Sequence, residues 1–235
     1  MSLIDLRRDG NVFVLRMQSG ENRFNGPFLT ALNEALDTVE RSSGPAALVT
    51  VGQDKFYSNG LDLAWMSGEG AGESGTFVGA VLRFLGRIMA CTVPTVAAIN
   101  GHAFAAGGMM ALAHDFRVMR ADRGFFCLPE VDINLPLAPG MTALIKNRLS
   151  PAAFRDTILT GARLGGSDAR DRGIVDDAVP AADVLPRAIA RAAALADKNR
   201  EIYGALKRGM YGDVLRILEA GSAAPLAGAI ERSGN

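Results

Sequence analysis

The chain has 235 residues, 49% of them hydrophobic and 21% charged, which is the composition of an ordinary globular domain. Its 25 basic and 25 acidic side chains give a formal net charge of zero, which argues against a nucleic-acid track or an anionic membrane surface as partner. No apolar run reaches the roughly 18–20 residues of a membrane span, and residues 1–5 lack the pattern of a signal peptide. We therefore expect one substantial domain in the cytoplasm.

Cysteine and histidine are too scarce for a disulfide framework or a metal centre. Cys91 and Cys127 each lie in an apolar run, so we expect two buried free thiols. His102 and His114 stand at a spacing that no metal motif uses, so we expect no metal site. His114 is expected to be structural, whereas His102 is either a packed wall residue or a substrate contact.

Strand and helix patterns alternate through the first half of the chain. Residues 11–17 are rich in β-branched and other apolar side chains and predict a strand, and residues 23–41 carry apolar side chains at helical spacing. The continuous apolar run at 46–51 is typical of a strand buried on both faces. Further strands are expected at 93–99, 116–119 and 125–128, and further helices at 77–91 and 107–114.

Residues 67–76 are rich in glycine and serine and predict a flexible loop. Part of this segment resembles a dinucleotide fingerprint, but the strand that should precede it and its last glycine are missing. We therefore interpret it as a loop without a nucleotide.

From residue 141 onward the pattern is mostly helical. Helix starts are expected at Ser150 and near Asp168, a long amphipathic helix at 181–198, and a final helix opening at Gly212. The sequence thus predicts an α/β core over residues 1–195 and a C-terminal helical region over residues 196–235.

Two segments share one design, because each leaves a buried strand and turns through small residues into a helix. The first is residues 58–63, Ser-Asn-Gly-Leu-Asp-Leu, and the second is residues 99–108, Ile-Asn-Gly-His-Ala-Phe-Ala-Ala-Gly-Gly. Small residues let a ligand approach the backbone, and the first N–H groups of a helix have no internal partner. One N–H from each turn could therefore bind the same carbonyl oxygen.

These two segments resemble the oxyanion turns of the enoyl-CoA hydratase/isomerase (crotonase) superfamily. Residues 114–119 resemble its next strand, 128–131 the segment that bears a catalytic glutamate, and 173–176 a later Gly-Ile-Val-Asp stretch. The resemblance implies a crotonase-like spiral of ββα units, with a C-terminal helical region for oligomerisation or as a cover of the active site. It also implies an acyl-CoA thioester as substrate, no separate cofactor, and a homotrimer or a dimer of trimers.

The resemblance also implies the site residues. Glu130 is the expected catalytic base, and the backbone N–H groups of Leu61 and Ala106 are the expected oxyanion hole. Many family members have glycine at the Ala106 position, but alanine keeps the N–H. The expected substrate-binding residues are Ser58, Gly60, Asp62, Trp65, His102 and Gly107.

The carboxylates distinguish between the reactions of the superfamily. The hydratases resembled here use two glutamates, and Met109 occupies the position of the first, where a thioether cannot serve as a base. One carboxylate suffices for a 1,3-proton shift, so we expect a Δ3,Δ2-enoyl-CoA isomerase of fatty-acid metabolism in which Glu130 moves a proton from C2 to C4. Asp132 stays open as a second carboxylate, since an extended segment would place it on the same face as Glu130.

Two alternatives remain open: an enoyl-CoA hydratase or another lyase of the superfamily, and an acyl-CoA-binding protein without turnover. Loop 67–76 is a candidate lid. Lys207 and Arg208 either meet a phosphate or lie on a solvated helix face. The apolar side chains expected either to line an acyl pocket or to fill the core are Trp65, Met66, Phe77, Val81 and Phe84.

Overall fold

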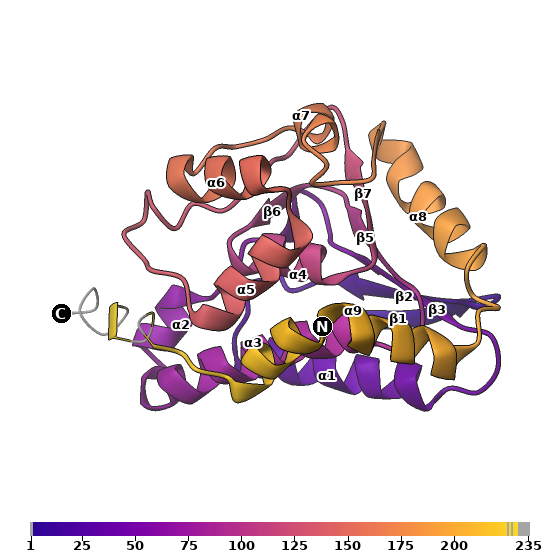
Figure 1. The fold of residues 1–235 in the computed structure, drawn as a ribbon, viewed down its shortest axis with the longest axis horizontal. Coiled ribbons are helices and arrows are strands. Elements are labelled where there is room, and N and C mark those ends of the chain that lie inside the picture. The colour runs from indigo at the N-terminus through magenta and orange to yellow at the C-terminus, as the bar shows by residue number, and fades with distance from the viewer. Residues whose placement is uncertain (1, 225, 227, 230–235) are drawn as a thin grey trace.

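A computed structural model describes residues 2–224, 226, 228 and 229. Its main sheet has six strands in the order β1-β2-β3-β5-β7-β9; β1 is antiparallel to β2 and the other pairs are parallel (Figure 1). The strands are β1 (Ile4–Asp9), β2 (Val12–Met17), β3 (Ala47–Val51), β5 (Thr95–Ile99), β7 (Phe116–Arg120) and β9 (Asp177–Val179).

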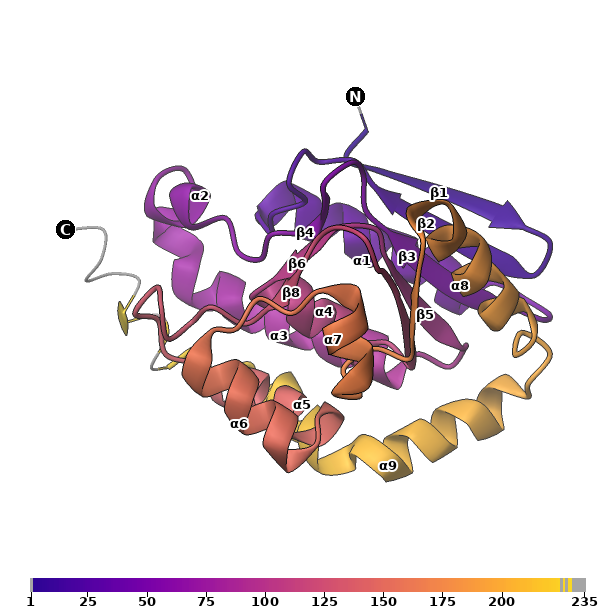
Figure 2. The ribbon, with the colours of Figure 1, turned by 90° about the horizontal axis from the view of Figure 1, so that it is seen from above.

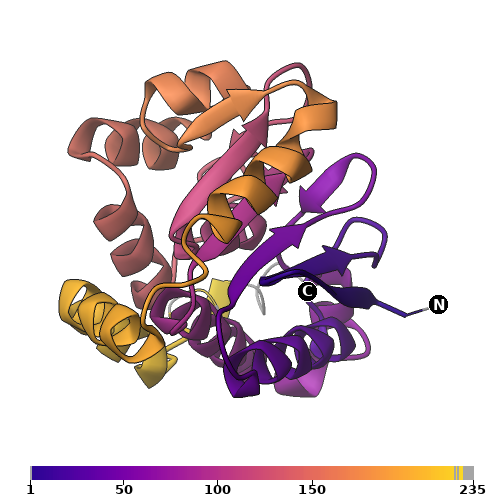
Figure 3. The same ribbon diagram turned by 90° about the vertical axis from the view of Figure 1, so that its right-hand side faces the viewer.

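Helices cover both faces of this sheet. They are α1 (Gly26–Arg41), α3 (Ser74–Ala90) and α4 (Ala106–Ala113) on one face and α8 (Val184–Ala193) on the other. Side chains alternate between the faces, so Val12 and Val14 pack towards α8, whereas Phe13 and Leu15 pack into the larger core. In Figure 3, α8 lies across the strands. This two-sided burial explains why the parallel strands read as continuous apolar runs.

Three short parallel strands form a second sheet in the order β4-β6-β8. They are β4 (Phe56–Ser58), β6 (His102–Phe104) and β8 (Phe126–Cys127). Each follows a strand of the main sheet, and β4 and β6 lead into α2 (Leu63–Ser67) and α4. This repeat of two strands and a helix confirms the predicted α/β spiral.

The rest of the chain adds η1 (Ala71–Glu73), η2 (Ala181–Asp183), α5 (Pro139–Arg148), α6 (Pro151–Thr160), α7 (Gly166–Asp171) and α9 (Arg200–Ala220). Figure 2 shows α9 running along one edge of the molecule towards α5. The division into a core and a C-terminal region stays a prediction, although α9 begins close to the expected boundary.

Three predicted elements are corrected. The segment 67–76 is not one long loop, because it contains the end of α2, the turn η1 and the start of α3. The helix expected over 181–198 divides into η2 and α8 and ends at Ala193. The final helix opens not at Gly212 but at Arg200, where the Asn199 side chain accepts a hydrogen bond from the N–H of Ile202 at 3.0 Å.

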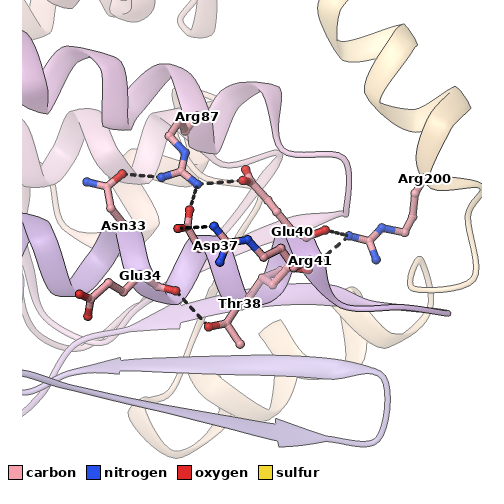
Figure 4. Close-up of polar contacts among 9 residues, drawn as sticks. Asn33, Glu34, Asp37, Thr38, Glu40, Arg41, Arg87 and Arg200 are labelled. Carbon is pink, nitrogen blue, oxygen red and sulfur yellow. Dashed lines mark hydrogen bonds and ion pairs between the residues drawn. The ribbon is translucent and has the colours of Figure 1, made fainter.

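Arginines tie α1 to α3 and to α9 (Figure 4). Arg87 of α3 donates to Asn33 at 2.7 Å, Asp37 at 2.7 Å and Glu40 at 2.8 Å, all on α1. At the start of α9, Arg200 donates to the last carbonyls of α1, including that of Glu40 at 3.0 Å. The beginning of α9 is therefore anchored to the end of α1.

Candidate active site

The two small-residue turns lie against each other. Gly60 has φ +83°, and a Cβ at this position would lie 2.9 Å from the Cβ of Ala105 and 3.2 Å from the nitrogen of Ala106. A Cβ at Gly107 would lie only 2.3 Å from the carbonyl oxygen of Ser58. Only glycine fits at these contacts, and its absence of a side chain lets the turns meet.

Each turn presents one of the N–H groups expected in the oxyanion hole. Ala106 is the first residue of α4, so its N–H has no partner within the helix. Ala105 before it has φ 48° and ψ −125°, a left-handed conformation that is rare outside glycine and marks a strained turn. Leu61 is bracketed by two hydrogen bonds to Phe24, from Phe24 N to Gly60 O at 2.8 Å and from Asp62 N to Phe24 O at 2.9 Å.

Leu61 and Ala106 line one cavity of about 310 Å³ together with Glu130. Apart from these three residues, its lining comprises Arg23, Asn59, Leu63, Phe104, Ala105, Met109, Pro129, Asp132, Ile133, Leu135, Pro136, Met141, Arg163 and Leu226. Exposed residues such as Asp132 and Arg163 mark its mouth, whereas Met109 and Met141 are buried. The chain thus encloses a mostly apolar pocket with few polar groups, as small-molecule sites usually do.

Glu130 is the buried carboxyl of this cavity, with 9% of its surface exposed. The turn after β8 holds its backbone, because Leu135 N donates to Glu130 O at 3.0 Å. Its Oε2 has no hydrogen-bond partner within the described part of the chain. Burial raises the pKa of Glu130 from 4.5 to about 7, so the group exchanges a proton near neutral pH, as a general base must.

Met109 and Asp132 lie in the same cavity as Glu130. Met109 is 1% exposed, so the position where a hydratase would carry its other glutamate is buried and apolar. The carboxylate of Asp132 is exposed and lies beside Gly161, where a Cβ would approach its Oδ2 to 2.3 Å. Asp132 thus reaches the cavity from its mouth, unlike the buried Glu130.

The predicted substrate-binding residues of the two turns support the backbone. Ser58 is fully buried, and its Oγ donates to the Asn22 carbonyl at 2.7 Å. Asp62 caps α2 by accepting from Trp65 N at 3.1 Å. With Gly60 and Gly107 in the contact between the turns, these residues shape the site, and none of the four lines the cavity.

Trp65 also lies outside the cavity lining and packs against Phe77, with ring centroids 4.9 Å apart. Of the five apolar residues expected in the pocket or the core, Met66, Phe77, Val81 and Phe84 are buried in the core, and Trp65 packs against it. None of the five lines the cavity.

His102 stacks in an aromatic cluster next to the cavity, 5.0 Å from Phe104, 5.5 Å from Phe56 and 5.6 Å from Phe125 between ring centroids. Burial, with the nearby Arg163, lowers the pKa of His102. Phe104 separates it from the cavity, since only Phe104 of this pair belongs to the lining.

The remaining titratable groups are structural. His114 is fully buried, with Nδ1 2.8 Å from Met110 O and Nε2 3.0 Å from Thr50 Oγ1. Cys91 and Cys127 are buried free thiols, as predicted. The expectation of a solvated face is wrong for Lys207, which is 4% exposed and pairs with Asp115 at 2.8 Å, whereas Arg208 is exposed.

Several cavity residues escaped the sequence reasoning. Arg23 and Asn59 both contact Glu21, at 2.6 and 2.8 Å, and Arg163 lies over the Phe104 ring at 5.8 Å. Met141 and Leu226 had no signal either, because apolar residues in helical patterns predict core. Of these five residues, only Asn59 lies within one of the recognised motifs.

Among the described residues, no group of three histidine, cysteine, aspartate or glutamate side chains could hold a metal ion. No helix in this part of the chain is long and apolar enough to cross a membrane.

Comparison with known proteins places this geometry in a family. Residues 7–226 match the Enoyl-CoA hydratase/isomerase family. Enoyl-CoA delta isomerase 3 of Arabidopsis thaliana is 34% identical over 224 residues, covering 91% of this chain and 94% of that protein. The peroxisomal enoyl-CoA delta isomerase 2 of the same plant is 32% identical over 230 residues, with the same coverage of 91% and 94%.

The solved structure of human mitochondrial delta3-delta2-enoyl-CoA isomerase has the same fold, with a TM-score of 0.84 at 22% identity over 99% of this chain and 96% of that one. The family match spans nearly the whole sequence, and relatives above 30% identity cover most of it. These matches confirm the predicted resemblance: this chain belongs to the enoyl-CoA hydratase/isomerase family.

Proposed function

We propose that this protein is an enoyl-CoA isomerase that converts a 3-enoyl thioester into the 2-enoyl thioester. One observation carries the proposal: Glu130 is the buried carboxyl of a cavity that is also lined by the buried, apolar Met109. A single base that can hold and return one proton suits isomerisation, whereas water addition needs more than one proton-handling group. Relatives named enoyl-CoA delta isomerase support it.

In the proposed mechanism, the thioester oxygen accepts hydrogen bonds from the N–H groups of Leu61 and Ala106. Glu130 removes a proton from C2, and the electron pair of that C–H bond forms an enolate whose charge lies on the held oxygen. Each donor contributes roughly 3–4 kcal/mol to this transition state. As the carbonyl re-forms, the double bond moves from C3–C4 to C2–C3, and the protonated Glu130 delivers its proton to C4.

Other parts of the proposal rest on the expected family pattern. Trp65 and His102 are proposed contacts for parts of the acyl-CoA that extend beyond the cavity. Ser58, Gly60, Asp62 and Gly107 are proposed to act by shaping the two turns. The substrate brings its own coenzyme A, and the proton shift needs no further cofactor.

A homotrimer or a dimer of trimers is proposed as the assembly. The apolar residues Ile202, Leu206 and Met210 recur every four positions on α9 and are 57%, 61% and 66% exposed, which fits a contact surface. A cytoplasmic location stays a proposal, and the relatives include peroxisomal proteins.

The test is turnover of purified protein with 3-hexenoyl-CoA. Absorbance of the conjugated 2-enoyl thioester should rise, and addition of water to crotonyl-CoA should be slow or absent. Fast hydration of crotonyl-CoA would overturn the assignment in favour of a hydratase.

Asp132 motivates a second candidate, a hydratase or dehydratase, because it lines the same cavity as Glu130. In that case crotonyl-CoA hydration would be fast and an Asp132→Asn variant would lose it. Under the isomerase proposal the same variant keeps most of its isomerase activity.

A further inference from the structure

The least exposed long side chains of the cavity lining are apolar, and one of them comes from beyond the last long helix. Met109, Met141 and Leu226 all line the cavity and are 1%, 2% and 3% exposed. Their neighbours at the mouth, such as Leu63 at 36% and Ile133 at 45%, are open to solvent. The end of a substrate chain that enters past Glu130 would therefore meet the two methionines and Leu226.

Leu226 reaches this place because the end of α9 is seated closely on the core. A Cβ at Gly79 would lie 2.7 Å from the carbonyl oxygen of Gly221, and one at Gly140 would lie 3.1 Å from Leu218. Gly79 of α3 and Gly140 of α5 therefore let α9 approach closely. Gly221 ends the helix in a left-handed conformation with φ 61°.

The other end of α9 is held by Arg200 on the last carbonyls of α1. Beyond the fixed helix, Leu226 belongs to the buried core and lines the cavity. The position of Leu226 thus depends on tertiary packing along the whole of α9.

We infer that Leu226 determines which acyl chains this enzyme accepts, by closing the apolar end of the cavity. The inference rests on the proposed function and names its substrate class: unbranched 3-enoyl thioesters whose chain ends before Leu226. Methionine side chains adapt to what they touch, so Met109 and Met141 adjust to the chain, whereas a leucine wall has a more definite position. Each further methylene that becomes buried should raise kcat/KM roughly fourfold.

The experiment measures kcat/KM for 3-enoyl-CoA substrates of six, eight, ten and twelve carbons. Leu226→Ala removes the wall and should shift the preferred chain to longer substrates, with about a tenfold rise in the ratio of the longer to the shorter. Leu226→Phe should shift the ratio the other way by a similar factor. Leu36→Ala is the matched control, because Leu36 is 2% exposed in the same core on α1 and does not line the cavity.

Affinities for saturated acyl-CoA of the same lengths, measured by calorimetry, separate this inference from the proposed function. The wild-type protein could fail to isomerise while the Leu226 variants still shift the chain length that binds most tightly. That result would remove the isomerase proposal and support the role of Leu226 in closing the cavity. Profiles of both kcat/KM and affinity that are the same in wild type, Leu226→Ala and Leu226→Phe would overturn the inference. Absence of any acyl-CoA binding would overturn both.

Discussion

The two walls of the cavity differ in the chemistry that each can perform. The wall built by α4 places Met109 at 1% exposure, and the wall that follows β8 places Glu130 at 9% exposure. Both positions are buried beside the same paired turns, but only one carries a titratable group. The difference teaches that the fold provides the binding site for the thioester. The side chains that line this site decide whether the enzyme shifts one proton or adds water.

Removing the carboxyl from the Glu130 wall should have the largest effect. In a Glu130→Gln variant, isomerase kcat should fall about 10²–10⁴-fold, since a positioned general base contributes that much. Steady-state assays with 3-hexenoyl-CoA measure the loss. Asp132→Asn, at the mouth of the same cavity, is the control and should change kcat by less than about threefold; full activity in Glu130→Gln would exclude the residue from the mechanism.

Acidic pH should inactivate the enzyme reversibly by protonating Glu130. The base must be unprotonated, and burial raises the pKa of Glu130 to about 7, so kcat/KM should rise with pH and level off above that value. Between pH 5 and pH 8 the expected gain is about hundredfold, because only about 1% of a group with this pKa is ionised at pH 5. A profile that is flat down to pH 5 would contradict the assignment.

The same burial should be visible in folding stability. The pKa of Glu130 is raised from 4.5 to about 7 in the folded protein, so the folded state loses stability as pH rises through this window. Glu130→Gln removes the titration. Its free energy of unfolding relative to wild type should therefore increase by about 3 kcal/mol between pH 4 and pH 8, measured by urea titration. A constant difference across this range would show that the carboxyl is not desolvated.

Adding a carboxyl at Met109 should make the two walls alike, because each would then carry a titratable group. In Met109→Glu, two acids share one buried site, so one of them should hold its proton and isomerase kcat should fall by about tenfold. A second proton-handling group should also bring measurable hydration of crotonyl-CoA. Met109→Leu keeps the wall apolar and should cost less than about 1.5 kcal/mol of stability without adding hydration; equal hydration in both variants would break the comparison.

Local sequence predicted the elements whose signals are local. Burial on both faces restricts a strand to apolar residues, which made β3 and β5 recognisable as apolar runs. Close backbone approach restricts a turn to small residues, which made the turns at 58–63 and 99–108 recognisable. Helix α9 was predicted to open at Gly212, because apolar residues at helical spacing follow it. The helix begins at Arg200 instead, since its packing on α3 and α5 offsets the weak helix propensity of its internal glycines.

By itself, the sequence determined the family resemblance, the α/β spiral and the choice of Glu130 and Met109 as the deciding pair, because each rests on short motifs in a fixed order. Only the tertiary structure decided that Gly60 and Ala105 touch, that Lys207 is buried against Asp115, and that Leu226 lines the cavity. These features join residues far apart in the chain. In the sequence these residues are an ordinary glycine, lysine and leucine. Their roles become recognisable only when packing brings their contact partners next to them.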